Sequence, residues 1–195
     1  MNGSLPMGSK LSESILAQQL DSTIAPVRAA IKMLEQENLV DVKPRSGTYV
    51  FQFNEKEMRQ IIEYRIYLES DSLRISGTVN KNALVQKLSL ILDKMKIAVS
   101  RGNLDACASY DSEFHRAIFE MTQNQFFIEG YAMIASRLEA IVNTLRYSNT
   151  MMKIAIEHYT QIISFIKSDE VDSAVELLKE HLEPGFQLKP SLNPQ

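Results

Sequence analysis

The sequence has little of what marks secreted, membrane-spanning and nucleotide-binding proteins. It holds one cysteine among 195 residues, which excludes a disulfide framework within the chain and fits a reducing compartment. It has no run of about eighteen apolar residues and no basic-then-apolar leader, so we expect neither a membrane span nor a signal peptide. CxxC pairs, glycine-rich phosphate loops and a nucleophile elbow are also missing. These absences predict a soluble, cytoplasmic protein.

Positive charge is not in excess. Lys and Arg number 21 against 24 Asp and Glu, and the formal net charge of -3 argues against binding a polyanion through bulk charge. Residues 1–52 carry five basic and five acidic side chains. The composition therefore neither supports nor excludes DNA binding through a local patch.

The first quarter of the chain has the pattern of two short helices followed by a β-hairpin. Apolar residues at helical spacing predict one helix over Leu11–Leu20 and a second that begins near Thr23 and ends near Asn38. Segments 39–42 and 48–53 favour strands and are separated by a turn with two basic residues. The predicted unit is a helix-turn-helix with a basic hairpin.

This order of elements is typical of a winged DNA-binding module, in which the second helix enters the major groove and the hairpin reaches the backbone or the minor groove. Arg28 could pair with a guanine and Thr23 with a phosphate. Lys43 and Arg45 would flank the duplex. The alternative is a structural cap in which the two hairpins only pack together.

After Asn54 every long segment has helical spacing, which predicts an all-α bundle of six helices. The third helix carries Asp111 and His115, and the last carries His181. For the fifth helix the spacing predicts an inward stripe of Met151, Ala155, His158, Ile162 and Phe165. Cys107 is expected to be a small core residue of the third helix.

The three histidines of the chain all fall on predicted inward stripes. Asp111 and His115 are four residues apart and can bind one ion from a single helix, and His158 and His181 can approach it from successive helices. Imidazole and carboxylate ligands suit Zn²⁺, Ni²⁺, Fe²⁺ or Mn²⁺. The alternative is that each histidine is an ordinary core or boundary residue.

The first quarter also carries a family pattern. The segments Leu5-Pro-Met-Gly-Ser-Lys-Leu-Ser-Glu, Ala25-Pro-Val-Arg-Ala-Ala-Ile and Gly47-Thr-Tyr-Val resemble the winged helix-turn-helix of GntR-type transcription regulators. The resemblance adds Gly47 to the expected DNA-binding residues. In that family an Arg follows the Ser or Thr at the start of the recognition helix, whereas Ile24 follows Thr23 here. A family helix precedes the Leu-Pro turn, so we expect an incomplete module.

The resemblance extends over residues 55–183. Asp111-x-x-x-His115, Glu157-His158 and Glu180-His181-Leu182 resemble the FCD effector domain of the FadR branch of GntR regulators. The resemblance implies that the Asp and the three His bind a divalent metal and that a small organic acid completes its coordination. Arg65, four residues before Glu69, is the candidate second anchor for that acid, since guanidinium pairs with carboxylate. An internal ion pair with Glu69 is the alternative.

We therefore expect a mainly α chain with an incomplete winged helix-turn-helix over 1–53, an all-α effector and metal domain over 54–185, and a tail over 186–195. The expected function is ligand-responsive transcription regulation by a homodimer on a double-stranded DNA operator, without enzymatic activity. Two alternatives stay open. A metal with an open position could activate water in an enzyme, or the bundle could be a sensor that no longer binds DNA.

Overall fold

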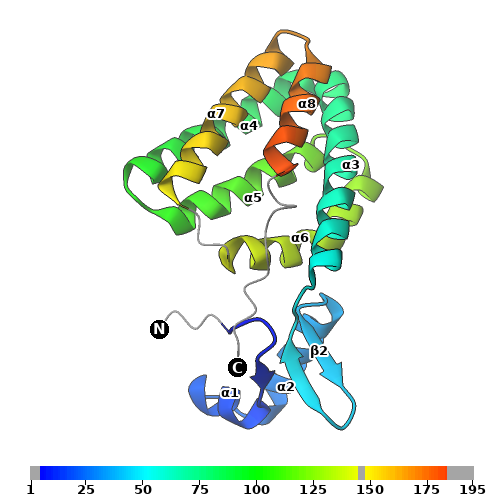
Figure 1. The fold of residues 1–195 in the computed structure, drawn as a ribbon, viewed down its shortest axis with the longest axis vertical. Helices are drawn as coiled ribbons and strands as arrows, with labels where there is room; N and C mark the ends of the chain where they lie inside the picture. Colours follow the sequence, from blue (N-terminus) through cyan, green and yellow to red (C-terminus); the bar gives the residue numbers. More distant parts are fainter. Residues whose placement is uncertain (1–4, 145–147, 184–195) are drawn as a thin grey trace. The chain divides into compact units, whose positions relative to one another are not determined.

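The computed structural model describes residues 5–144 and 148–183. The chain divides into two compact units, Met1–Asn54 and Glu55–Gln195. The described residues form eight helices and three short strands, so the predicted mainly helical fold with a small β element is confirmed (Figure 1). The predicted tail over 186–195 lies outside the described residues.

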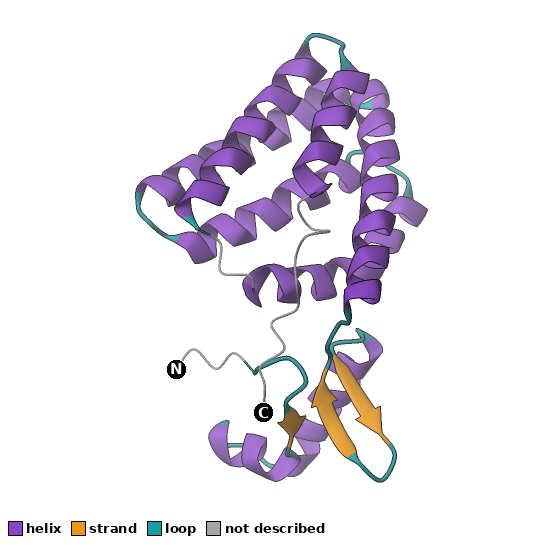
Figure 2. Ribbon diagram, viewed as in Figure 1, coloured by secondary structure: helices purple, strands orange, loops and turns teal. Residues whose placement is uncertain are grey.

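The N-terminal unit combines two helices with an antiparallel sheet (Figure 2). Its elements are β1 (Lys10–Leu11), α1 (Glu13–Gln19), α2 (Ile24–Gln36), β2 (Val40–Lys43) and β3 (Gly47–Val50). The strand order is β1-β3-β2, with Lys10 opposite Tyr49 and Lys43 opposite Gly47. The order along the chain is that of a helix-turn-helix with a wing, to which β1 adds a third strand.

The start of the first helix differs from the prediction. Leu11 lies in β1, and α1 begins at Glu13 because the Ser12 side chain accepts a hydrogen bond from the Ile15 backbone N–H. Leu11 is nevertheless buried, in a core that contains Ala17, Val27, Ile31 and Val40. An apolar residue at this point packs inward from a strand as well as from a helix, so spacing alone does not distinguish the two.

The second unit is a bundle of the six predicted helices. They are α3 (Glu55–Val79), α4 (Lys81–Ser100), α5 (Leu104–Glu120), α6 (Gln125–Thr144), α7 (Asn149–Lys167) and α8 (Val171–Leu182). Helix α4 packs against α5 and α7, and α8 packs against α3 and α7 (Figure 1). Among the described residues, no helix has both the length and the apolar character that crossing a membrane requires.

The bundle has one large core to which α3, α4, α5, α7 and α8 contribute. Its fully buried side chains include Leu73, Leu84, Leu88, Cys107, Phe114, Ile118, Met152, Tyr159, Ile162 and Ile166. Cys107 is thus a core residue with a free thiol, as the sequence predicts. In this structure, packing of this kind sets which face of each helix points inward, and with it the direction of the inward polar side chains.

Burial along α4 makes a direct stability test. Leu88 is 0% exposed, whereas Leu90 on the same helix is 59% exposed. We expect Leu88→Ala to lower the free energy of unfolding by about 2–5 kcal/mol, because it removes buried methyl groups and leaves a cavity. Leu90→Ala should change it by about 0.5 kcal/mol or less. Urea unfolding followed by circular dichroism measures both, and equal losses would contradict the described orientation of α4.

Candidate metal centre

Three candidate metal ligands converge inside the bundle. Asp111 and His115 lie one turn apart on α5, and His181 comes from α8. One ligand atom from each lies within 4.8 Å of those of the other two. Asp111 and His115 are buried, and His181 is partly buried. These residues have the spacing and the chemistry of a divalent metal site.

A buried carboxylate on α3 orients His115. Glu69 accepts from Arg65 Nε at Oε1 (2.5 Å), and its Oε2 lies 2.7 Å from His115 Nδ1. Because Nδ1 faces this carboxylate, Nε2 is the ring nitrogen that faces the Tyr159 hydroxyl, which also contacts Asp111 and His181. A carboxylate behind a histidine is the usual partner of a metal-binding imidazole, since it fixes the ring and its tautomer.

Electrostatics keeps this group of charges in place. Burial alone raises the pKa of Glu69, but the charges of Arg65 and His115 outweigh it and lower that pKa to about 2. Burial likewise lowers the pKa of Arg65, and the charge of Glu69 overcomes it, so the pKa of this guanidinium lies above its ordinary value. Glu69 is therefore a carboxylate at neutral pH.

His181 is held in its neutral form. Burial, and then the charge of His115, lower the pKa of the His181 imidazole to about 3. A metal binds the unprotonated ring, so a histidine with this pKa has no proton to lose at neutral pH.

His158 lies beside the three residues without joining them. Its ring centroid is 5.6 Å from that of His181, and its Nδ1 is buried with no hydrogen-bond partner among the described residues. Of the predicted inward stripe of its helix, Ala155 and Ile162 are buried as expected, whereas the prediction is wrong by one residue at Met151, His158 and Phe165. The buried residues of α7 are Met152, Ala155, Tyr159, Ile162, Ile163 and Ile166. His158 is on the flank of this stripe, because successive helical residues are about 100° apart.

Tyr159, which the sequence analysis does not single out, is the residue that α7 points into the cluster. Its hydroxyl donates to Asp111 Oδ1 (2.5 Å) and lies 2.9 Å from Nε2 of both His115 and His181. Its ring stacks on Phe114 at 3.8 Å between centroids. Helical spacing gives no clear signal for it, because Ala155 and Ile162 fit a stripe through Tyr159 and a stripe through His158 equally well.

The donor set fits a divalent ion. It offers one carboxylate and neutral or carboxylate-backed imidazoles, and His158 adds a buried ring nitrogen without a partner. Such ligands suit Zn²⁺ and the neighbouring transition metals better than Mg²⁺ or Ca²⁺, which prefer oxygen. The predicted four, Asp111, His115, His158 and His181, could thus hold a metal, with His158 farther from the centre than the prediction has it.

Arg65, the predicted effector anchor, is buried and paired with Glu69. This contact is the internal ion pair with Glu69 that is the alternative to effector binding by Arg65. It engages the guanidinium through Nε.

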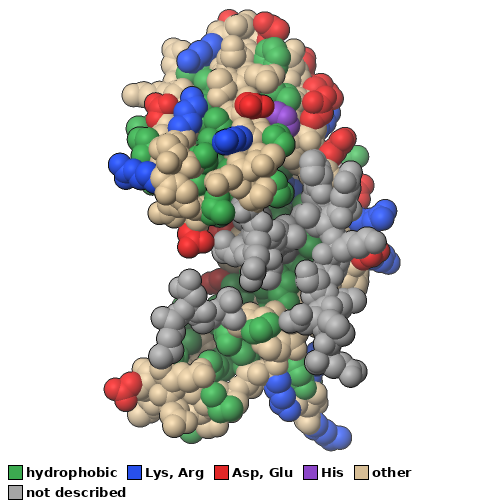
Figure 3. Space-filling view, turned by 60° about the vertical axis from the view of Figure 1, so that its left-hand side comes forward, with side chains coloured by type: hydrophobic (Ala, Val, Ile, Leu, Met, Phe, Trp, Pro, Cys, Tyr) green, Lys and Arg blue, Asp and Glu red, His purple; other side chains and the backbone are tan. Residues whose placement is uncertain are grey.

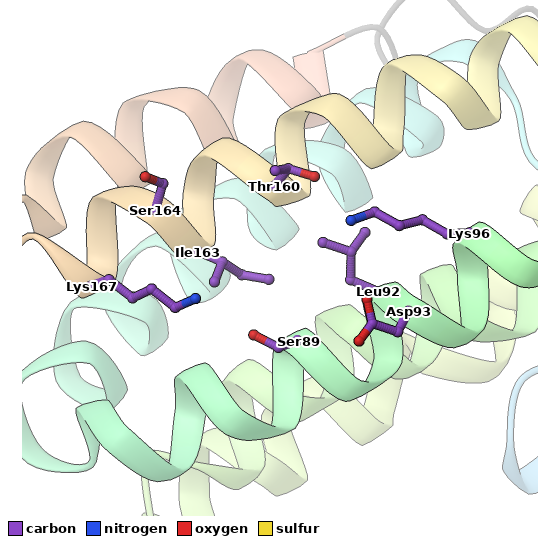
Figure 4. Close-up of a pocket in the computed structure, with 8 residues that line it drawn as sticks. All are labelled: Ser89, Leu92, Asp93, Lys96, Thr160, Ile163, Ser164 and Lys167. Atoms are coloured by element: carbon purple, nitrogen blue, oxygen red, sulfur yellow. The ribbon is translucent and has the colours of Figure 1, made fainter.

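A groove of about 440 Å³ lies elsewhere, between α4 and α7. Figure 4 shows Lys96 and Lys167 toward its two ends, with Ser89 and Thr160 between them. None of the predicted metal ligands lines it. The groove is therefore separate from the candidate metal centre.

On the N-terminal unit, the predicted contacts of the recognition helix lie on the surface. Thr23 is the N-cap residue of α2 and is exposed, and its side chain makes no capping hydrogen bond. Arg28 is also exposed and forms an ion pair with Glu13 of α1 (2.7 Å). Ile24, at the position where the family has Arg, is 46% exposed. The helix thus offers DNA one hydroxyl and one guanidinium at these positions.

The wing gathers more basic charge than the sequence suggests. Strand β1 brings Lys10 beside Tyr49, and the ammonium groups of Lys10 and Lys43 lie 5.8 Å and 5.0 Å from the centre of that ring. Arg45 is exposed at the hairpin tip. Figure 3 shows Lys and Arg side chains that project from this unit. Sequence reasoning missed Lys10 because its place depends on the pairing of β1.

Gly47 has a structural reason to be glycine. Its φ is +128°, and a Cβ there would lie 2.6 Å from Lys10 Cε. Both the backbone conformation and the close approach of Lys10 therefore disfavour a side chain. Gly47 shapes the wing that carries Lys43 and Arg45.

Comparisons with known proteins agree with this arrangement. The FCD domain model matches residues 60–184, and the model described as bacterial regulatory proteins, gntR family, matches residues 1–50. The gluconate operon transcriptional repressor of Bacillus licheniformis is 28% identical over 144 residues, which are 74% of this chain. The chain spans only 57% of the length of that repressor.

Solved structures share the fold. E. coli McbR/YncC superposes with a TM-score of 0.79 at 21% identity and covers 95% of this chain and 88% of its own. A structure described as the metal-free FCD domain of TM0439 gives a TM-score of 0.55 at 21% identity and covers 70% of this chain and 93% of its own. Because the FCD model alone spans more than half of the chain, the chain belongs to the gntR family of bacterial regulatory proteins with an FCD domain.

Proposed function

We propose that the chain is the DNA-binding and ligand-sensing part of a cytoplasmic transcription regulator, whose FCD domain binds a divalent metal and a small organic acid. The observation that carries this proposal is the convergence of Asp111, His115 and His181 in front of the buried Glu69 carboxylate. The relatives named above are described as repressors or regulators, and no feature of the site favours an enzyme over a sensor.

In this proposal Asp111, His115, His158 and His181 hold the ion. Four protein ligands leave two positions of an octahedral ion open, and a carboxylate or hydroxy acid can occupy both. The metal supplies a binding position for the effector. Arg65 is the proposed second anchor: its Nε is engaged by Glu69, whereas bidentate pairing with a carboxylate can also use the terminal guanidinium nitrogens.

The proposed DNA contacts are Thr23 and Arg28 on α2 and Lys43 and Arg45 on the wing, which Gly47 shapes. Their exposure supports this role. Lys10 extends the basic surface of the wing. A homodimer would present two such units to the half-sites of a double-stranded operator, and effector binding in the bundle would alter their spacing.

The metal site can be tested with two aspartates of α5. After loading with Zn²⁺, Ni²⁺, Mn²⁺ or Fe²⁺ and gel filtration, elemental analysis should find about one ion per wild-type chain for at least one metal. Asp111→Ala should lose most of it, because a ligand is removed. Asp105→Ala, on the exposed first turn of the same helix, should retain it. Equal metal content in the two variants would remove Asp111 from the site.

The carboxylate behind His115 gives a second test. Glu69→Gln keeps the size of the side chain but removes its charge, and we expect metal affinity to fall about 10- to 100-fold. It should also lower stability, because Arg65 would be left buried without its counter-charge. Glu63→Gln, on the exposed face of α3, is the matched control. Titration calorimetry measures the affinity for the metal. An unchanged affinity would show that Glu69 pairs with Arg65 and has no part in metal binding.

DNA binding is tested by its salt dependence. A duplex enriched from a random-sequence pool by the wild-type chain serves as the probe. Lys43→Ala should weaken binding and reduce the slope of log K against log salt by about 0.9, the loss expected for one phosphate contact. Lys96→Ala, on α4, removes the same charge from the other unit and should leave the slope unchanged. Failure to enrich any duplex would favour a sensor that does not bind DNA.

A further inference from the structure

The Tyr159 hydroxyl lies among the three atoms that a metal would bind. It is within 2.9 Å of Asp111 Oδ1, His115 Nε2 and His181 Nε2. The hydroxyl thus connects the same groups that an ion would connect.

We propose that this hydroxyl is an internal occupant of the metal site: it holds the three ligand groups together in the metal-free domain, and a divalent ion binds by displacing it. The proposal rests on the metal binding of the proposed function and adds the residue that opposes it.

The hydroxyl and an ion compete for the same directions. Each imidazole nitrogen has a single in-plane position for a hydrogen bond or a metal bond. At His115 and His181 the Nε2 position is taken by Tyr159, and at His115 the other nitrogen faces Glu69. Ligand bonds to an ion therefore require that both Nε2 contacts with Tyr159 break.

Packing keeps the hydroxyl in this place. The Tyr159 ring is fully buried and lies almost parallel to Phe114, at 15° between the ring planes. A ring held on both sides by the core does not swing freely in its cavity. Displacing the hydroxyl therefore involves the helix that carries it.

His158, the residue before Tyr159 on α7, indicates the direction in which the Tyr159 hydroxyl would be displaced. His158 has a buried Nδ1 without a hydrogen-bond partner among the described residues, and its ring lies next to His181. Successive side chains project about 100° apart around a helix. A turn of α7 about its axis that withdraws Tyr159 moves His158 toward the other ligands. The metal-free site uses Tyr159, and the metal-bound site uses His158.

The test removes only the hydroxyl. Tyr159→Phe keeps the ring and its stacking on Phe114 but deletes the three polar contacts. In the chelator-treated chain we expect its melting temperature to fall by several degrees, because those contacts stabilise the metal-free domain. For the ion that the wild type binds, titration calorimetry should show affinity about tenfold higher or more, since the competing contacts are gone.

His158→Ala should act in the opposite sense. It should weaken binding of the same ion at least tenfold while the melting temperature of the metal-free chain changes little, because Nδ1 of His158 has no partner to lose. Tyr110→Phe, which deletes a hydroxyl from a half-buried tyrosine of α5 outside the cluster, is the control and should leave both quantities unchanged.

The outcomes separate this proposal from the metal site itself. If the wild type binds the ion and Tyr159→Phe binds it equally or more weakly, the proposal that Tyr159 occupies the site is overturned and the metal site itself stands. Weaker binding by Tyr159→Phe would make Tyr159 a ligand. An unchanged melting temperature for metal-free Tyr159→Phe would overturn it as well. Binding of no ion by the wild type or by Tyr159→Phe would overturn the metal site of the proposed function and this proposal with it.

Discussion

The candidate metal centre depends on one buried charge, the carboxylate of Glu69. A carboxylate without exposure to water is stable only when opposite charge and hydrogen-bond donors surround it. Arg65 supplies the charge from the same helix, and His115 supplies a ring nitrogen from α5. The contact to His115 therefore fixes both the position of α3 against α5 and the direction of the imidazole. Asp111, one turn earlier on α5, is placed by the same packing.

Much of this arrangement could be predicted from the sequence because it depends on local spacing. Asp111 and His115 are four residues apart, and the six helices of the bundle follow from apolar periodicity. The chain also has few histidines, so their position on predicted inward faces was informative. What spacing could not give is the rotation of α7. A helical stripe through His158 and one through Tyr159 differ by one residue, and the packing of α7 in the core, with Tyr159 stacked on Phe114, decides between them.

The N-terminal unit also contains a feature that the sequence pattern does not predict, the short strand β1. Its helix-turn-helix and hairpin follow from local pattern, whereas a strand of two residues leaves almost no periodic signal. The pairing of β1 with β3 is nevertheless what brings Lys10 to Tyr49 and places the end of its side chain close to Gly47. Contacts between residues far apart in the sequence thus determine which basic side chains gather on the wing, and the sequence pattern of the hairpin does not contain those contacts.

Helix α7 has an outer face as well as the inner one that carries Tyr159. Thr160, Ser164 and Lys167 on that outer face line the groove against α4. A rigid helix that turns about its axis carries all its side chains through the same angle, so a turn that withdraws the Tyr159 hydroxyl also shifts this wall of the groove. The width of the groove at the surface therefore changes when the Tyr159 hydroxyl is displaced in the core. A pair of spin labels on the two sides of the groove would record this displacement as a change in distance.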